Sequence, residues 1–142
     1  VGVGSYQSSL LYAYQSYQEA QKALAIGNKM RLQIAFYEKL GLYKLLAPVS
    51  ETEAAKELLS TYIAPLQEYD KKNGGNLLPM LETLLKNDWN LKETAKELFI
   101  HYNTAKYRYN KIEELLQLDF HDNENRLQLA LALKLMALFP KV

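Results

Sequence analysis

The sequence lacks cysteine altogether and has only two histidines. Without cysteine, a disulfide scaffold and a thiolate metal site are excluded. His101 and His121 have no second histidine or paired carboxylate at metal-ligand spacing, so we expect neither a metal site nor a cofactor. The sequence also shows no nucleophile–base pair, and the segment 73–76 lacks the lysine of a phosphate-binding loop. We therefore expect a protein that is not an enzyme.

Long apolar runs are also missing. A transmembrane helix needs about 20 consecutive apolar residues, whereas the longest runs here, such as residues 129–133, have five. We expect no membrane partner. The first residues show no basic segment followed by an apolar one, so no signal peptide is predicted. The sequence does not begin with methionine, and on this ground we expect a piece of a longer protein.

The composition is that of a folded chain. The 142 residues are 49% hydrophobic with a net charge of +1, which is too apolar and too weakly charged for a disordered protein. The length suits one ordinary domain, or a small domain and part of another. Residues 101–112 contain Lys106, Arg108 and Lys111 and no acid. A protein contacts a polyanion through one face, so this local excess is more informative than the total charge.

Residues 1–46 show a strand–helix–strand pattern. Residues 1–4 fit the end of a strand, and residues 33–37 fit a second one. Between them, apolar residues recur at helical spacing on one face: Leu10, Tyr14, Tyr17, Ala20 and Leu24. Gly27-Asn28 is expected to end this helix. We expect Tyr14, Tyr17 and also Tyr62 in the core, and we interpret the segment as a short βαβ-like remnant of a larger domain.

The middle of the chain contains a helix start, a break and a turn. Ser50 and Glu53 have the spacing of a capping box that opens a helix. Pro65 is expected to break this helix near Ile63, because proline removes a backbone donor. Residues 71–76 are the clearest turn or hinge and mark our predicted domain boundary.

Four helices are predicted after this turn, so that the chain is mainly α. They are expected at 77–85, at 91–98 after an Asn90 cap, at 103–116, and at 127–139 after a cap at 122–124. The last one is apolar on most sides, which is typical of a helix in a core or at an interface.

Residues 90–116 have the spacing of a helix-turn-helix. Ala95 is small where two steeply crossing helices need a close approach, and Ile100 can fill the corner between them. In such a motif the second helix presents its N-terminal half to the DNA major groove while its other face stays in the core.

The second helix of this motif divides into two faces. The stripe expected to be buried consists of Ala105, Tyr109, Ile112 and Leu116. The opposite face carries Asn103, Tyr107 and Asn110, with Lys106 and Lys111 at its flanks. Asparagine can pair with the edge of adenine, lysine with guanine or phosphate, and tyrosine hydroxyls with phosphate.

Several of these residues have a second interpretation. Asn103 and Thr104 either contact DNA or only cap the helix. His101 is expected at a helix N-cap or on a phosphate rather than in catalysis. Arg108 either contacts phosphate or pairs with an acid such as Glu93 or Glu97. Lys92 either touches the DNA backbone or is an ordinary solvated lysine.

At residues 101–115, His-Tyr-Asn-Thr-Ala-Lys-Tyr-Arg-Tyr-Asn-Lys-Ile-Glu-Glu-Leu, the sequence resembles the C-terminal DNA-binding domain of the PucR/CdaR family. These are bacterial regulators of purine catabolism, sugar-diacid use and related pathways. Thr94-Ala95, Leu98 and residues 125–131 also match the family pattern, and residues 40–46 look like its connector. Residues 1–46 look like the tail of its GGDEF-like central domain.

The resemblance implies a cytoplasmic transcription regulator that binds double-stranded DNA, with a recognition helix at about 102–116. It implies a homodimer in the full-length protein and a small-molecule effector on a region upstream. The implied division is a truncated GGDEF-like part at 1–47, a connecting helix and linker at 48–73, and the DNA-binding domain at 74–142. The implied DNA-binding residues are His101, Tyr102, Asn103, Thr104, Lys106, Tyr107 and Asn110. The implied phosphate contacts are Lys92, Arg108 and Lys111.

The sequence departs from the family pattern at three positions. Tyr102 replaces a frequent arginine, and Ala105 and Tyr109 stand at two leucine positions. Because tyrosine is larger than leucine and alanine smaller, we hypothesise that the two changes compensate in the core. The alternative function is a helical protein-interaction or dimerisation module without sequence-specific DNA binding.

Overall fold

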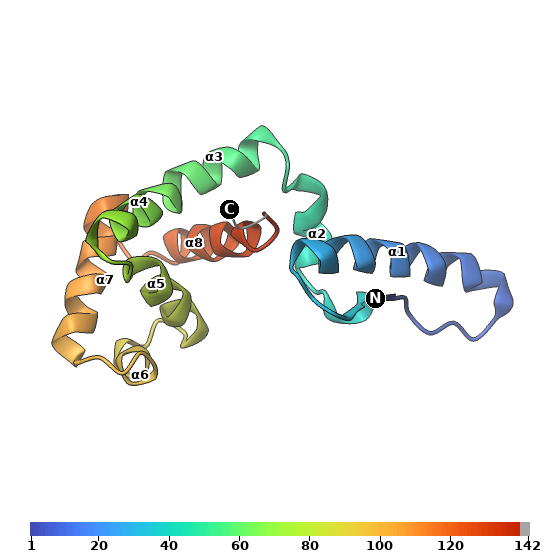
Figure 1. Cartoon of the computed structure of the whole chain (residues 1–142), viewed down its shortest axis with the longest axis horizontal. Helices are drawn as coiled ribbons and strands as arrows, with labels where there is room; N and C mark the ends of the chain where they lie inside the picture. The colour runs from blue at the N-terminus through green and yellow to red at the C-terminus, as the bar shows by residue number, and fades with distance from the viewer. Residues whose placement is uncertain (140–142) are drawn as a thin grey trace. The chain divides into compact units, whose positions relative to one another are not determined.

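The computed structural model describes residues 1–139, which fall into two compact units (Figure 1). Unit 1 comprises residues 1–55 and the described residues from Lys134 onward, and unit 2 comprises residues 56–133. The fold is mainly α, as predicted, with one small parallel sheet near the start of the chain. No helix in the described range is both long and apolar enough to span a membrane.

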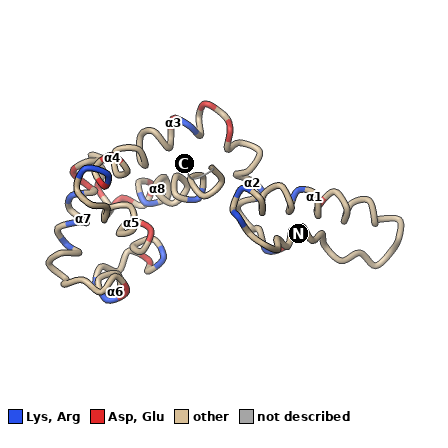
Figure 2. The backbone as a smooth tube through the Cα atoms, in the orientation of Figure 1, with Lys and Arg blue, Asp and Glu red and all other residues tan. Residues whose placement is uncertain are grey.

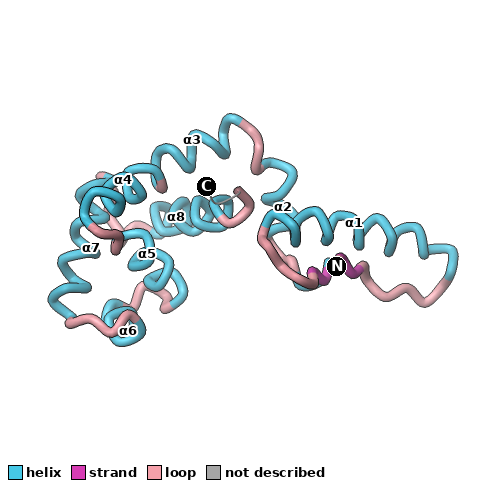
Figure 3. The backbone as a smooth tube through the Cα atoms, viewed as in Figure 1, coloured by secondary structure: helices cyan, strands magenta, loops and turns pink. Residues whose placement is uncertain are grey.

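Unit 1 contains the predicted strand–helix–strand arrangement (Figure 3). Strand β1 (Gly2–Val3) pairs in parallel with β2 (Ala35–Phe36), with Gly2 opposite Ala35, and helix α1 (Ala13–Lys29) packs on both strands. The second strand is shorter than the predicted 33–37, because a 3-10 turn (η2, Tyr37–Lys39) begins directly after Phe36.

Glycines let β1 lie directly against the backbone of α1. A Cβ atom at Gly2 would lie 2.1 Å from the carbonyl oxygen of Ala20, and one at Gly4 would lie 2.0 Å from that of Ser16. Real Cβ atoms essentially never approach so closely. The strand can therefore hold this position only with glycine at both sites.

The expected apolar stripe of α1 is exposed, so the prediction of a tyrosine core is wrong there. Tyr14 is 69% exposed, Tyr17 is 58% exposed and Leu10 is 93% exposed. The buried residues of α1 are Ala23, Ile26 and Gly27, the face that meets the two strands. The described strands are too short to cover the tyrosine face as well. Tyr62 is half-buried, and its hydroxyl bonds Gln128.

The helix α1 also continues past its predicted stop. Gly27 and Asn28 are helical, the helix ends at Lys29, and Arg31 then takes a left-handed conformation with φ of 58°. A Cβ at Gly27 would lie 2.7 Å from the Cβ of Ala35. Gly27 is thus a contact point with β2 rather than a helix end.

The capping box at Ser50 is not formed. Residues Ala47–Val49 form a 3-10 turn (η3) after the short α2 (Tyr43–Leu46), and the buried Ser50 hydroxyl donates to the Ala47 carbonyl at 2.8 Å. Helix α3 (Glu53–Tyr62) begins instead after Thr52, whose hydroxyl oxygen accepts from the Ala55 amide at 3.3 Å.

A proline lies at the break between α3 and α4 (Ala64–Asn73), and two glycines form the turn after α4. Helix α3 ends at Tyr62, and α4 begins with Pro65 in its first turn, so the break predicted near Ile63 is confirmed. Lys71, Lys72 and Asn73 belong to α4. The turn itself is limited to residues 74–76, where Gly74 and Gly75 have φ of 84° and 68°.

The rest of unit 2 is built from α5 (Leu77–Lys86), α6 (Leu91–Glu97), α7 (Tyr102–Leu116) and most of α8 (Asn123–Met136). All four lie where helices were predicted, although α8 ends three residues early. The Asp122 carboxylate accepts from the Glu124 amide at 2.8 Å, which confirms the predicted cap. The fully buried large side chains of this core are Leu66, Leu77, Met80, Leu81, Leu84, Ile112, Phe120 and Leu129. Helix α8 is apolar on several sides, but Leu127 remains 53% exposed.

Candidate nucleic-acid interface

The first helix of the motif, α6, is fixed by its cap and by its small residues. The Asn90 side chain accepts from the amides of Lys92 at 3.1 Å and Glu93 at 3.2 Å, as predicted. Thr94 is fully buried and donates to the Asn90 carbonyl at 2.8 Å. Ala95 is 4% exposed, and α6 contacts both α5 and α7. The small Ala95 side chain is therefore buried, as a close approach of two helices requires.

The turn between α6 and α7 is tight. The Ile100 amide donates to the Ala95 carbonyl at 3.0 Å, and Ile100 is half-buried, in line with the predicted corner residue. Phe99 has a left-handed φ of 53°, which is uncommon for a non-glycine residue. Its ring is 96% exposed.

The start of α7 is capped by histidine. The Nδ1 atom of His101 accepts from the Asn103 amide at 3.5 Å, so the predicted N-cap is confirmed. Residues 101–104 are all exposed, which leaves the side chains of Tyr102, Asn103 and Thr104 open to a partner. Helix N-termini favour negatively charged groups, because their amides point outward.

The two predicted faces of α7 are largely present. Ala105 and Ile112 are fully buried, and Tyr109 and Leu116 are half-buried. On the other side, the exposed residues are Asn103, Lys106, Tyr107 and Asn110. Figure 2 marks the basic positions along this helix in blue. No acid occurs in α7 before Glu113.

An aromatic cluster supports the back of α7. The rings of Tyr109 and Phe120 meet edge to face at 5.0 Å, and Trp89 meets Phe120 at the same distance. Arg126 lies 5.1 Å from the Trp89 ring centroid and bonds the Phe120 carbonyl. Burial raises the pKa of Tyr109 above its usual value. The cluster fixes the helix from the side opposite to its polar face.

Tyr107 and Lys111 are tied to Tyr69 of α4, a contact that the sequence did not predict. A hydrogen bond with Tyr107 raises the pKa of Tyr69. Lys111 lies 5.8 Å from the Tyr69 ring centroid and pairs with Glu114 at 3.1 Å. The hydrogen bond to Glu114 raises the pKa of Lys111. The Lys111 side chain is only 23% exposed and is paired with Glu114, which limits its availability as a phosphate contact.

The other basic residues predicted to contact DNA, Lys92, Lys106 and Arg108, are less restrained than Lys111. The acids proposed as partners of Arg108 are occupied elsewhere: Glu93 pairs with Lys96 at 2.9 Å, and Glu97 pairs with Lys86. The hydrogen bond from Lys86 lowers the pKa of Glu97. Within residues 1–139, no ion pair holds Arg108, Lys92 or Lys106.

The described residues contain no group of three or more histidine, cysteine, aspartate or glutamate side chains that could hold a metal. What they do contain is a short capped helix, a tight turn and a second helix with an exposed, acid-free N-terminal half. A helix of this kind fits the major groove of B-DNA, where base edges offer hydrogen-bond partners to amide and ammonium groups.

Comparison with known proteins agrees with this geometry. Residues 77–135 match the PucR C-terminal helix-turn-helix domain family. The chain is 34% identical to the proline-responsive transcriptional activator PutR of Bacillus subtilis, over 96% of this chain and 34% of that protein. It is 34% identical to the carbohydrate diacid regulator of Escherichia coli, over 95% of this chain and 35% of the relative.

A third relative is the purine catabolism regulatory protein of Bacillus subtilis, with 29% identity over 96% of this chain and 26% of that protein. The chain thus spans between about a quarter and about a third of the length of these relatives. These relatives are regulators, not enzymes. Residues 77–135 therefore match the PucR C-terminal helix-turn-helix domain family, which confirms the resemblance seen at residues 101–115.

Proposed function

We propose that α7 is the recognition helix of a DNA-binding transcription regulator and enters the major groove with its N-terminal half. One observation carries the proposal. Residues 101–104 and the side chains of Lys106, Tyr107 and Asn110 are exposed, while Ala105 and Ile112 hold the opposite face in the core. The match to a helix-turn-helix domain family and the transcriptional activator among the relatives support DNA as the partner.

The proposal gives each residue a role. Asn103 and Asn110 pair with base edges, and Lys106 pairs with guanine or phosphate. His101, Tyr102, Thr104 and Tyr107 are exposed and lie where they can contact the DNA backbone. Outside this face, Lys92 and Arg108 contact phosphates. Lys111 must break its ion pair with Glu114 before it can contact a phosphate. We therefore assign Lys111 the smallest contribution to DNA affinity.

We further propose that two copies bind together in the full-length protein. Each recognition helix carries only a few basic side chains. Because each phosphate contact adds a limited, salt-dependent contribution to DNA affinity, one copy is expected to bind weakly. A dimer that reads two half-sites about one helical turn apart gains the affinity that one copy lacks.

The rest of the proposal concerns the longer protein. We propose that it acts in the bacterial cytoplasm and responds to a small molecule bound upstream of this chain. The names of two relatives, one proline-responsive and one a carbohydrate diacid regulator, support control by a small molecule. We assign residues 74–142 to the DNA-binding domain, 48–73 to a connecting helix and linker, and 1–47 to the end of a GGDEF-like domain. The family match over 77–135 supports the first of these.

The first experiment is a selection from a random duplex DNA pool with the full 142-residue chain in moderate salt. We expect an enriched motif, and two-fold symmetry in it would support the dimer. If neither the chain nor a covalently linked pair of chains enriches a motif, sequence readout is excluded. The helical interaction module is then the better description.

Variants test the role of α7 itself. The double change Lys106→Ala and Tyr107→Ala is expected to weaken binding and alter the selected motif. Lys39→Ala, which removes the same charge from unit 1, is the control and should leave both unchanged. If the double variant keeps wild-type affinity and motif, α7 is not the reading helix.

A further inference from the structure

Unit 1 contains a cavity of about 330 Å³ that the DNA-binding function does not use. It lies between α1 and the segment that contains η2, α2 and η3, with all its lining residues between 22 and 48. Its volume is within the range of small-molecule sites, which begins at roughly 300 Å³. The lining residues are Lys22, Ala25, Ile26, Lys29, Tyr37, Lys44, Ala47 and Pro48.

We propose that this cavity binds a small organic carboxylate with an apolar or aromatic body. Lys22, Lys29 and Lys44 are the charged side chains of the lining. Glu51 is the acid that pairs with one of them, Lys29, at 3.0 Å. Glu19 interacts electrostatically with Lys44, so the three ammonium groups of the lining face two carboxylates and a net positive charge remains. A bound anion removes it.

The positions of the lysines follow from the elements that carry them. Lys22 and Lys29 are two helical turns apart on the same face of α1, which places them about 10 Å apart along the helix axis. Lys44 comes from α2, and its ammonium lies 4.6 Å from the centroid of the Tyr37 ring. The ring therefore holds this cation at the cavity without neutralising it.

The walls between the lysines are apolar, and this determines the ligand class. Ala25, Ile26, Ala47 and Pro48 offer no hydrogen-bonding side chains. An inorganic anion would leave this surface in contact with water. A carboxylate with an apolar body buries the surface and places its charge among the lysines.

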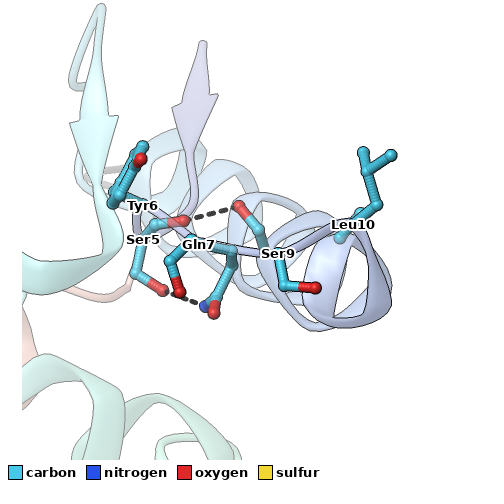
Figure 4. Close-up of a pocket in the computed structure, with 8 residues that line it drawn as sticks. Ser5, Tyr6, Gln7, Ser9 and Leu10 are labelled. Carbon is cyan, nitrogen blue, oxygen red and sulfur yellow. Dashed lines mark hydrogen bonds between the residues drawn. The ribbon is translucent and has the colours of Figure 1, made fainter.

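The second cavity of unit 1 lacks this combination. It measures about 440 Å³ and is lined by serines, Gln7, Tyr6, Leu10 and Ala13, with no charged side chain (Figure 4). Its polar groups are used within the chain, since Gln7 donates to the Ser5 hydroxyl at 3.1 Å and Ser16 donates to the Ser5 carbonyl at 2.7 Å. Of these two cavities, the one lined by Lys22, Lys29 and Lys44 is thus the one with charged side chains in its lining.

The test is an NMR titration of the isotope-labelled 142-residue chain, without DNA, using benzoate as the probe. Benzamide, which has the same shape without the charge, and inorganic phosphate, which has the charge without the apolar body, are titrated in parallel. We expect saturable shifts at the amides of Ala25, Ile26 and Ala47 with benzoate and not with the other two. Equal responses to benzamide or to phosphate would overturn the proposed ligand class, and a benzoate response that never saturates would overturn the site.

Three variants separate the site from general charge effects. Lys22→Glu changes an exposed side chain and is expected to weaken benzoate binding at least about tenfold, or 1.4 kcal/mol. Lys44→Ala should weaken it as well. Lys39→Ala is the matched control, because Lys39 also lies over a ring, 4.9 Å from the Phe36 centroid, but outside the cavity. Equal losses in Lys39→Ala and Lys22→Glu would overturn the proposal. Because the readout contains no DNA, failure here leaves the proposed DNA-binding function untouched.

Discussion

At the residue scale, Ala105 and Tyr109 lie one turn apart on the core side of α7. Ala105 is fully buried, and the Tyr109 ring packs edge to face on Phe120. A leucine at position 105 adds volume to a filled site, while a leucine at 109 removes volume from the next turn. The two sites therefore offer a direct test of compensation in the core.

We predict that Ala105→Leu alone lowers the free energy of unfolding by about 1–3 kcal/mol through overpacking. Tyr109→Leu alone should cost about 0.5–1.5 kcal/mol for the lost aromatic pair, beyond the loss of buried area. The double variant should cost much less than the sum, and its melting temperature should stay near that of the wild type. Urea unfolding of the four proteins measures this coupling. Strictly additive losses, with a large drop in melting temperature, would contradict the compensation.

Individual residues of α7 show how much of the candidate interface could be predicted from the sequence. The burial of Ala105 and Ile112 and the exposure of Asn103 follow from helical spacing, which is local information. The contact of Lys111 with Tyr69 could not be predicted, because Tyr69 lies far away in the sequence and reaches α7 only in the folded unit. Nothing in the spacing of α4 indicates this contact.

At the element scale, α5 receives its N-terminal cap from the preceding helix. Asp70 of α4 accepts from the backbone amides of Asn76, Leu77 and Leu78 at 2.8 to 2.9 Å. The residue at the usual cap position, Asn76, makes no capping bond with its side chain. The predicted hinge at 71–76 is therefore bridged by one carboxylate.

We predict that Asp70→Ala lowers the free energy of unfolding by about 1–2 kcal/mol, because free amides at a helix start lose their acceptor. Asn76→Ala is the control and should change stability by a few tenths of a kcal/mol. Chemical denaturation measures both, and hydrogen exchange at Leu77 and Leu78 should accelerate only in the first variant. Equal losses in the two variants would show that Asp70 is not the cap.

The starts of α6 and α7 were predicted correctly from local signals, whereas the capping box expected at Ser50 and the buried face expected for α1 were wrong. The starts of α6 and α7 follow from Asn90 and His101, whose side chains bond amides two or three residues ahead. The exposed tyrosine face of α1 and the start of α3 could not be predicted in this way. The first depends on which face meets the two strands, and the second on a 3-10 turn that uses Ser50.

At the scale of the whole molecule, the question is how many copies share one DNA site. We predict that a duplex with two inverted half-sites about one helical turn apart binds the chain more tightly than a duplex with one half-site. Inserting half a turn between them should remove the gain, because the second half-site then faces away. Fluorescence anisotropy at several salt concentrations measures both affinities. Equal affinity for all three duplexes would contradict paired binding.

The single tryptophan of the chain has a practical consequence. Trp89 lies against Phe120 and Arg126 behind the recognition helix, and unit 1 contains only tyrosines and phenylalanines as aromatic residues. Fluorescence excited at a wavelength that tryptophan absorbs and tyrosine does not therefore reports on unit 2 alone. The protein carries a built-in optical probe with which the opening of the helix-turn-helix can be followed separately, with no label attached.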